Sequence, residues 1–212
     1  MAGMIVDTLT GTDSTLRKCL RDPIPEIADA ARFLDAATSA HLRGRLKLAE
    51  DLIRLADMPV IRDWTESIWA HDSAFVRFKI ASLPIADRVK ARMPTAAEKQ
   101  SIHARDGYHC RFCGIPVIRR EVRARISKRY PKALPWGTRN IEQHAAFQAM
   151  WAQYDHVVPH AKGGTNELGN VVLTCAPCNF GRMSNSLEEV GLLDPRNREP
   201  VQSQWDGLER FR

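Results

Sequence analysis

Two widely separated Cys-x-x-Cys pairs constrain the fold of this chain more than any other feature of its sequence. Cys110 and Cys113 form the first pair, and Cys175 and Cys178 form the second. Thiols at this spacing are typical of a metal site, and four thiolates complete the tetrahedral coordination of zinc without leaving a position for substrate. A redox dithiol would not require two matched pairs. We therefore predict structural Zn²⁺, which would hold the Cys110 turn against the start of a helix that carries Cys178.

The second pair follows a segment with the pattern of a β-hairpin. Valine-rich runs at residues 154–159 and 170–175 favour strands, and Gly163-Gly164 between them permits the positive φ angles of a tight reversal. A helix is expected directly after the hairpin. Four side chains of this segment can serve a metal ion or a proton transfer: Asp155, His156, Asn170 and Asn179.

Together these motifs resemble the HNH endonuclease family. The resemblance rests on Asp155-His156-Val157-Val158-Pro159, Gly163-Gly164, Asn170 and Cys175-x-x-Cys178-Asn179, within residues 110–182. It does not cover the N-terminal half, and the long interval between the cysteine pairs departs from the family pattern. The fold class that follows is α+β and mostly α: a helical N-terminal domain, then a zinc-braced ββα-metal domain with a helical insertion.

The resemblance implies that this segment hydrolyses phosphodiester bonds in DNA, with RNA not excluded. His156 would be the general base that activates water, and Asp155 and Asn179 would hold one catalytic divalent ion, Mg²⁺ or Mn²⁺. Asn170 would brace the hairpin loop. Arg182 lies three residues after Asn179 on the same helical face, which suggests a phosphate contact.

The chemistry of these residue types agrees with that role. A cation must neutralise charge on the phosphodiester, and carboxylate and amide oxygens are ligands that suit Mg²⁺ or Mn²⁺. An imidazole with an ordinary pKa of about 6.5 can accept a proton near neutral pH. Adjacent strand residues point to opposite faces, so Asp155 and His156 can address different partners. His160 follows in the hairpin loop, where it could assist at the metal or the substrate, although we expect it to face solvent.

Residues 115–153 separate the cysteine pairs and contain an amphipathic basic helix. Apolar residues repeat every four positions along one face, at Ile118, Val122, Ile126 and Tyr130. Glu121 is the one acid among seven basic residues, which are Arg119, Arg120, Arg123, Arg125, Lys128, Arg129 and Lys132. A solvated face is the ordinary interpretation of such a run, but its position beside the predicted site also suggests phosphate contact. Nucleic-acid binding is assigned to Arg119, Arg120, Arg123, Lys128 and Arg182.

Residues 13 to about 90 are expected to be mostly helical. Asp13-Ser14 would cap a short helix, Pro25-Glu26 would open the next one, and the wide apolar arc of residues 46–56 suggests a helix packed on two sides. Further along, Thr95 and Ser186 each begin a capping-box pattern.

The chain is accordingly divided into three parts. A helical domain of unknown role would occupy residues 1–94, and the nuclease domain residues 95–190 with its insertion at about 115–153. Within the insertion, Thr138 is expected to cap a second helix that reaches Trp151. The tail at 191–212 would pack back onto a domain surface through Trp205, Leu208 and Phe211.

Composition adds limits on location and partners. The 212 residues are 44% hydrophobic and 26% charged, as in ordinary globular proteins, and the formal net charge of +6 is compatible with nucleic-acid binding. The N-terminus lacks the layout of a signal peptide, and no apolar run approaches the roughly 20 residues of a membrane span. We therefore expect a cytoplasmic protein without membrane contact.

Two other functions stay open on the sequence alone. One is a zinc-stabilised nucleic-acid-binding module without catalytic activity. The other is a scaffold whose N-terminal helical domain recruits a protein partner or forms a homodimer. The intact set of Asp155, His156 and Asn179 counts against the first, and metal-dependent cleavage by the isolated chain would exclude the second.

Overall fold

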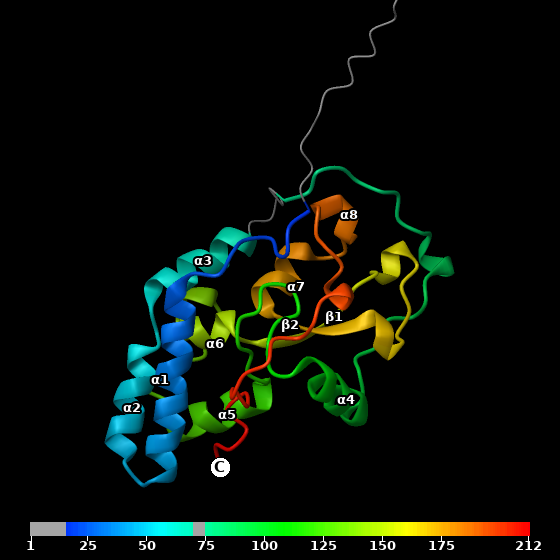
Figure 1. Cartoon of the computed structure of the whole chain (residues 1–212). Helices are drawn as coiled ribbons and strands as arrows, with labels where there is room; N and C mark the ends of the chain where they lie inside the picture. Colours follow the sequence, from blue (N-terminus) through cyan, green and yellow to red (C-terminus); the bar gives the residue numbers. More distant parts are fainter. Residues whose placement is uncertain (1–15, 70–74) are drawn as a thin grey trace, which may run out of the picture.

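The computed structural model describes residues 16–69 and 75–212. Its fold is α+β and mostly α, as predicted, with one two-stranded antiparallel sheet among short helices (Figure 1). Three N-terminal helices lie on one side of the molecule, and the hairpin and the helix that follows it lie at its centre. The predicted cap at Asp13-Ser14 lies outside the described residues.

The N-terminal helices are α1 (Pro25–Leu42), α2 (Leu46–Leu55) and α3 (Pro59–Trp69). Pro25 occupies the first turn of α1, where its missing N–H costs nothing. The prediction that α2 packs on two sides is wrong. Ala49 and Ile53 are buried, whereas Leu48 and Leu55 are 45% and 56% exposed, so α2 buries only the stripe that faces α1.

Two segments expected to be helical have other structures. Residues 16–24 form no helix, because the backbone of Arg17 is hydrogen-bonded instead to Gly191 and Leu193 in a short parallel bridge. Residues 75–94, which we call the strap, are extended apart from one short 3₁₀ turn, η1 (Ile85–Asp87). In Figure 1 the strap arches over the outer end of the hairpin.

The central hairpin consists of β1 (Ala152–His156) and β2 (Val171–Cys175), paired so that Asp155 faces Val172 and His156 faces Val171. Helix α7 (Ala176–Arg182) follows β2 without a break, and Pro177 in its first turn favours this start. The predicted order of hairpin and helix is confirmed. The hairpin loop contains two 3₁₀ turns, η3 (His160–Lys162) and η4 (Leu168–Asn170).

The insertion and the flanking helices follow the sequence pattern in part. Helix α5 (Arg120–Arg129) buries Val122 and Ile126 as predicted, and the capping boxes at Thr95 and Ser186 open α4 (Ala96–Asp106) and α8 (Leu187–Val190). Thr138 caps no long helix. Its segment forms only η2 (Asn140–Glu142) and the five-residue α6 (Ala145–Ala149).

The buried apolar side chains of both halves of the chain form one continuous cluster. Helix α3 packs against α6 and α7, which places the N-terminal helices directly behind the hairpin. The C-terminal tail, with its turn η5 (Pro195–Asn197), packs back as predicted: Leu208 and Phe211 are buried, and Trp205 Nε1 donates to the Val117 carbonyl oxygen at 3.0 Å. Within the described residues, the helices are all too short or too polar to cross a membrane.

Candidate functional site

The two cysteine pairs converge, as predicted, into one four-sulfur cluster. The Sγ atoms of Cys110, Cys113, Cys175 and Cys178 all lie within 4.8 Å of one another. A tetrahedral zinc ion with Zn–S bonds of about 2.3 Å requires sulfur–sulfur distances of about 3.8 Å, so the arrangement fits this ion. Two local structures present the thiols. One is the turn closed by Gly114, which has a φ of 81°, and the other is the junction of β2 and α7.

Beside the cluster, Asp155 and Arg182 form a buried ion pair. Arg182 Nε donates to Asp155 Oδ2 at 3.1 Å, and Nη2 donates to Oδ1 at 2.7 Å. The remaining Arg182 N–H groups donate to the carbonyl oxygens of His156, Val157 and Asn185. This arginine therefore ties the last helix of the ββα unit to the end of β1.

The predicted phosphate contact of Arg182 is not what the structure shows. Its side chain is only 1% exposed, and its donors are used inside the protein. A buried guanidinium requires such partners, because an unpaired charge in the interior is costly. Burial raises the pKa of Asp155 above its ordinary value, and the charge of Arg182 opposes that rise. The role of Arg182 here is to neutralise and orient a buried carboxylate.

Asp155 keeps the capacity to bind a cation in spite of this partner. Each carboxylate oxygen can accept about two hydrogen bonds or metal contacts, and Arg182 uses one on each oxygen. Asn179 is half-buried and lies one helical turn before Arg182, on the face of α7 that meets β1. Carboxylate and amide oxygens at this junction are the donor set that a Mg²⁺ or Mn²⁺ ion prefers. A carboxylate held by a second residue is also the usual arrangement of a metal ligand.

His156, at the end of β1, has a free ring nitrogen. Its Nε2 atom is buried and has no hydrogen-bond partner among the described residues. Burial lowers the pKa of His156 below its ordinary value, and the charge of the neighbouring His160 lowers it further. The neutral imidazole, which can accept a proton at Nε2, is therefore favoured near pH 7.

His160 lies against His156, whereas the favoured expectation from the sequence placed it in solvent. It was expected to face solvent, but its ring is half-buried and lies 4.3 Å from the ring of His156, centroid to centroid. Both of its ring nitrogens are buried without a partner among residues 16–69 and 75–212. The available sequence signal was its place four residues after His156, directly behind Pro159.

Asn170 holds the two sides of the hairpin loop together. Its Nδ2 donates to the carbonyl oxygens of Val158 and Thr165 at 3.0 and 2.9 Å, and its Oδ1 accepts from the Val158 N–H at 2.8 Å. Gly164 completes this packing, since a Cβ atom there would lie 1.7 Å from the Val158 oxygen. These contacts fix the direction in which the chain leaves His156.

The strap attaches to the same loop from outside. The Leu83 N–H donates to the Ala161 oxygen at 2.9 Å, and the side chain of Asn166 bonds the backbone of Lys90 and Arg92. The loop that carries His160 is thus held on its inner side by Asn170 and on its outer side by the strap.

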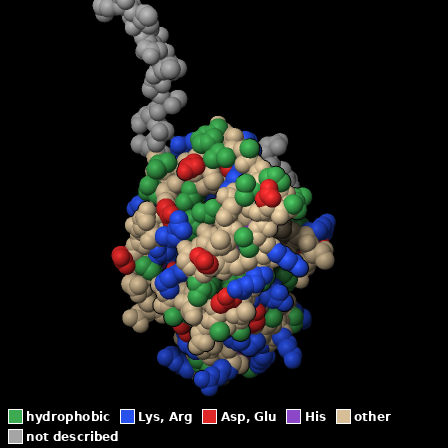
Figure 2. All heavy atoms as spheres, turned by 90° about the vertical axis from the view of Figure 1, so that its right-hand side faces the viewer, with side chains coloured by type: hydrophobic (Ala, Val, Ile, Leu, Met, Phe, Trp, Pro, Cys, Tyr) green, Lys and Arg blue, Asp and Glu red, His purple; other side chains and the backbone are tan. Residues whose placement is uncertain are grey.

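The four basic residues of the insertion that were assigned to nucleic acid have different environments. Arg119 forms a bidentate ion pair with Glu209 of the tail, which raises the pKa of Arg119. Arg123 stacks 3.5 Å above the Trp136 ring, and burial lowers its pKa to about 10. Both are internal contacts, contrary to the assignment. The side chains of Arg120 and Lys128 remain exposed, and Lys and Arg side chains gather on the lower part of the face in Figure 2.

Comparison with known proteins identifies the central segment. Residues 142–182 match the family model described as HNH endonuclease. The match begins at the end of η2 and ends with the last residue of α7, so it contains β1, the loop, β2 and the second cysteine pair. No curated protein and no solved structure matches the chain. Residues 142–182 are therefore similar to HNH endonuclease domains. The first cysteine pair lies outside the matched residues and completes a four-sulfur cluster that fits structural zinc.

Proposed function

We propose that this protein is a metal-dependent endonuclease that hydrolyses phosphodiester bonds in DNA. The observation that carries the proposal is the unpaired, buried Nε2 atom of His156, at the end of β1 and inside the segment that matches the HNH endonuclease model. A histidine with a lowered pKa and a free nitrogen is suited to the role of general base.

Each residue of the site has a defined task in this proposal. His156 Nε2 accepts a proton from the attacking water, whose oxygen forms the new bond to phosphorus. The bond from phosphorus to the 3′ oxygen breaks, and that oxygen takes a proton from solvent water, leaving 5′-phosphate and 3′-hydroxyl ends. Asp155 and Asn179 would hold a Mg²⁺ or Mn²⁺ ion, which when bound neutralises charge on the phosphate oxygens. Asn170 keeps the loop, and with it His156, in one orientation.

The zinc cluster and Arg182 hold the elements of the site in place and take no part in the reaction itself. Structural Zn²⁺ would join the Cys110 turn to α7, and the Asp155–Arg182 pair joins α7 to β1. The helix that carries Asn179 is thereby fixed at both ends relative to His156. We propose residues 95–190 as the nuclease domain, with the N-terminal helices α1 to α3 packed behind it.

One observation favours a second candidate. The guanidinium of Arg182 already neutralises Asp155, as it would in a zinc-stabilised module that binds nucleic acid without cutting it. Cleavage of supercoiled plasmid with Mg²⁺ or Mn²⁺ separates the two. The nuclease proposal predicts nicked or linear products with the wild type and none with His156→Ala. Binding without cleavage by both proteins would favour the module, provided that zinc content and melting temperature are equal.

A further inference from the structure

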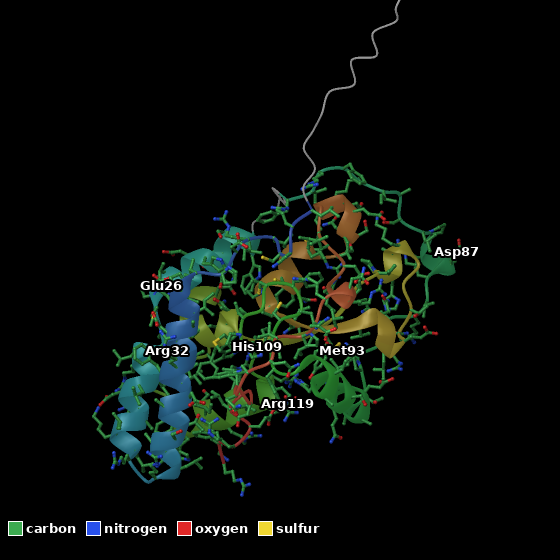
Figure 3. The ribbon with its side chains drawn as sticks, viewed as in Figure 1. Glu26, Arg32, Asp87, Met93, His109 and Arg119 are labelled. Carbon is green, nitrogen blue, oxygen red and sulfur yellow. The ribbon has the colours of Figure 1, made fainter. Side chains whose placement is uncertain are left out.

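A cavity of about 220 Å³ lies against β1, outside the catalytic groups described above. Its walls come from four places: the end of the strap, α4, the start of α5 and β1. The lining residues that matter here are Met93, Lys99, Arg120, Trp151, Gln153 and Tyr154. Met93 and Arg119, which are labelled in Figure 3, are both among the residues that line it. Met93, Lys99 and Arg120 precede the matched HNH segment, which begins at residue 142, whereas Trp151, Gln153 and Tyr154 lie within it.

The cavity combines an aromatic face with positive charge. Lys99 Nζ lies 5.3 Å from the centroid of the Tyr154 ring, and the Tyr154 hydroxyl is 3.1 Å from His103 Nε2, which fixes the ring. Arg119, on the same wall, is neutralised by Glu209. Lys99 and Arg120 therefore supply the positive charge that a ligand would meet, and the carboxylate of Glu121 also lines the cavity. Arg120 is 75% exposed and lies 4.0 Å from Glu121, a distance at which it keeps donors free for a phosphate.

The place of Tyr154 on β1 relates the cavity to the catalytic base. Tyr154 and His156 are two residues apart on one strand, so their side chains leave from the same face, about 7 Å apart. A nucleic-acid strand advances about 3.4 Å per nucleotide in a duplex and more when it is stretched. A strand whose scissile phosphate lies at His156 would therefore bring a neighbouring nucleotide to the cavity.

We propose that this cavity binds the base of a substrate nucleotide next to the cleaved bond. The base stacks on the Tyr154 ring, and the flexible Lys99 side chain turns from that ring to the nucleotide phosphate, with Arg120 beside it. Aromatic side chains next to cationic ones are the means by which proteins hold unpaired bases. Gln153 offers an amide to the edge of the base. The inference rests on the proposed function, since it takes the nucleic-acid strand as the ligand.

The test compares two ligands that differ only in their bases. Binding of a thymidine pentanucleotide and of a pentamer with the same sugar-phosphate chain but no bases is measured on the full-length His156→Ala protein. Because stacking of one base on an aromatic ring is a substantial fraction of such binding, we expect the pentamer without bases to bind at least about fivefold more weakly. Equal binding of the two ligands would overturn the proposal.

Variants at Tyr154 test whether the difference in affinity between the two pentamers arises in the cavity. In Tyr154→Phe the ring remains and the fivefold ratio should persist, whereas in Tyr154→Leu the ratio should fall toward one. Lys99→Ala should weaken both ligands alike, because it removes a phosphate contact and places a good helix former on the surface of α4. Lys47→Ala, on the exposed surface of α2, is the matched control and should leave the binding of both ligands unchanged. If Tyr154→Leu still bound the pentamer with bases fivefold more tightly than the one without, the base would not stack on Tyr154.

A second measurement needs no variant of the cavity. Photo-crosslinking of an oligonucleotide that contains 5-iodouracil should attach the base to the peptide with Trp151 and Tyr154, and a crosslink confined to other peptides would overturn the inference. These readouts measure binding without cleavage. If the wild type binds with the expected ratio but cuts no plasmid, the proposed function fails while the base pocket stands.

Discussion

The Asp155–Arg182 pair offers the sharpest test of how this site is built. Arg182→Ala removes five hydrogen bonds from a side chain that is 1% exposed, and it leaves the carboxylate of Asp155, itself 7% exposed, without its counter-charge. Arg182→Ala should therefore lower the free energy of unfolding much more than the same substitution of an ordinary surface arginine.

The size of the effect follows from the burial of both partners. Removing one member of a buried ion pair costs about 3–5 kcal/mol, because the other charge stays behind. For a chain of 212 residues, each kcal/mol lowers the melting temperature by about 2–4 °C, so the variant should melt roughly 6–20 °C below the wild type. Arg120→Ala, at an exposed position of the same residue type, should change the free energy of unfolding by less than about 0.5 kcal/mol.

The pH dependence of the melting temperature tests whether the unpaired charge of Asp155 causes this destabilisation. Without the guanidinium, the pKa of Asp155 should rise further, since burial already raises it and Arg182 is what opposes the rise. A carboxyl group whose pKa is raised in the folded state contributes stability at low pH and loses it as the pH increases through that pKa. The stability gap between Arg182→Ala and the wild type should therefore narrow between pH 7 and pH 5. Thermal unfolding followed by circular dichroism at both pH values measures this gap. Equal melting temperatures for Arg182→Ala and Arg120→Ala, or a gap that widens on acidification, would refute the reasoning.

Four further outcomes are expected. The pH profile of kcat/KM should show the essential base with an apparent pKa below about 6.5, because burial and the neighbouring imidazole lower the pKa of His156; an inflection well above 6.5 would contradict this role. The wild type should contain one equivalent of zinc, and Cys178→Ser should lose it and melt at a much lower temperature; full zinc content in the variant would count against the four-sulfur site. Glu209→Ala should free Arg119 to contact phosphate, so DNA affinity should rise and the slope of log affinity against log salt concentration should steepen by about one. An unchanged slope would show that Arg119 does not contact phosphate. Gly164→Ala should destabilise the loop and reduce cleavage, since its Cβ would lie 1.7 Å from a carbonyl oxygen, and a wild-type melting temperature would be inconsistent with that packing.

The sequence predicted what depends on short-range pattern. The paired cysteines, the strand–turn–strand–helix order and the capping boxes at Thr95 and Ser186 are each set by residues a few positions apart. Backbone geometry acts over this short range, and the spacing within each cysteine pair indicates metal-binding thiols even though the two pairs are 62 residues apart in the sequence. The HNH resemblance rested on the same kind of pattern, and the family match to residues 142–182 confirms it.

The errors concern partners that are distant in sequence. Arg119 looked free because its acid, Glu209, lies 90 residues away in the tail. Arg182 was placed on the correct helical face, but that face meets Asp155 in the interior and not solvent. The burial of His160 against His156 depends on the η3 turn, which helical or strand periodicity does not reveal.

One measurement tests the central claim most directly. A defined, end-labelled DNA duplex is incubated with the wild type and with His156→Ala in Mn²⁺, and the ends of any products are mapped. The account predicts products with 5′-phosphate and 3′-hydroxyl ends from the wild type, none from the variant, and none after chelation of the divalent ion. Cleavage that persists in a folded, zinc-loaded His156→Ala protein would contradict it.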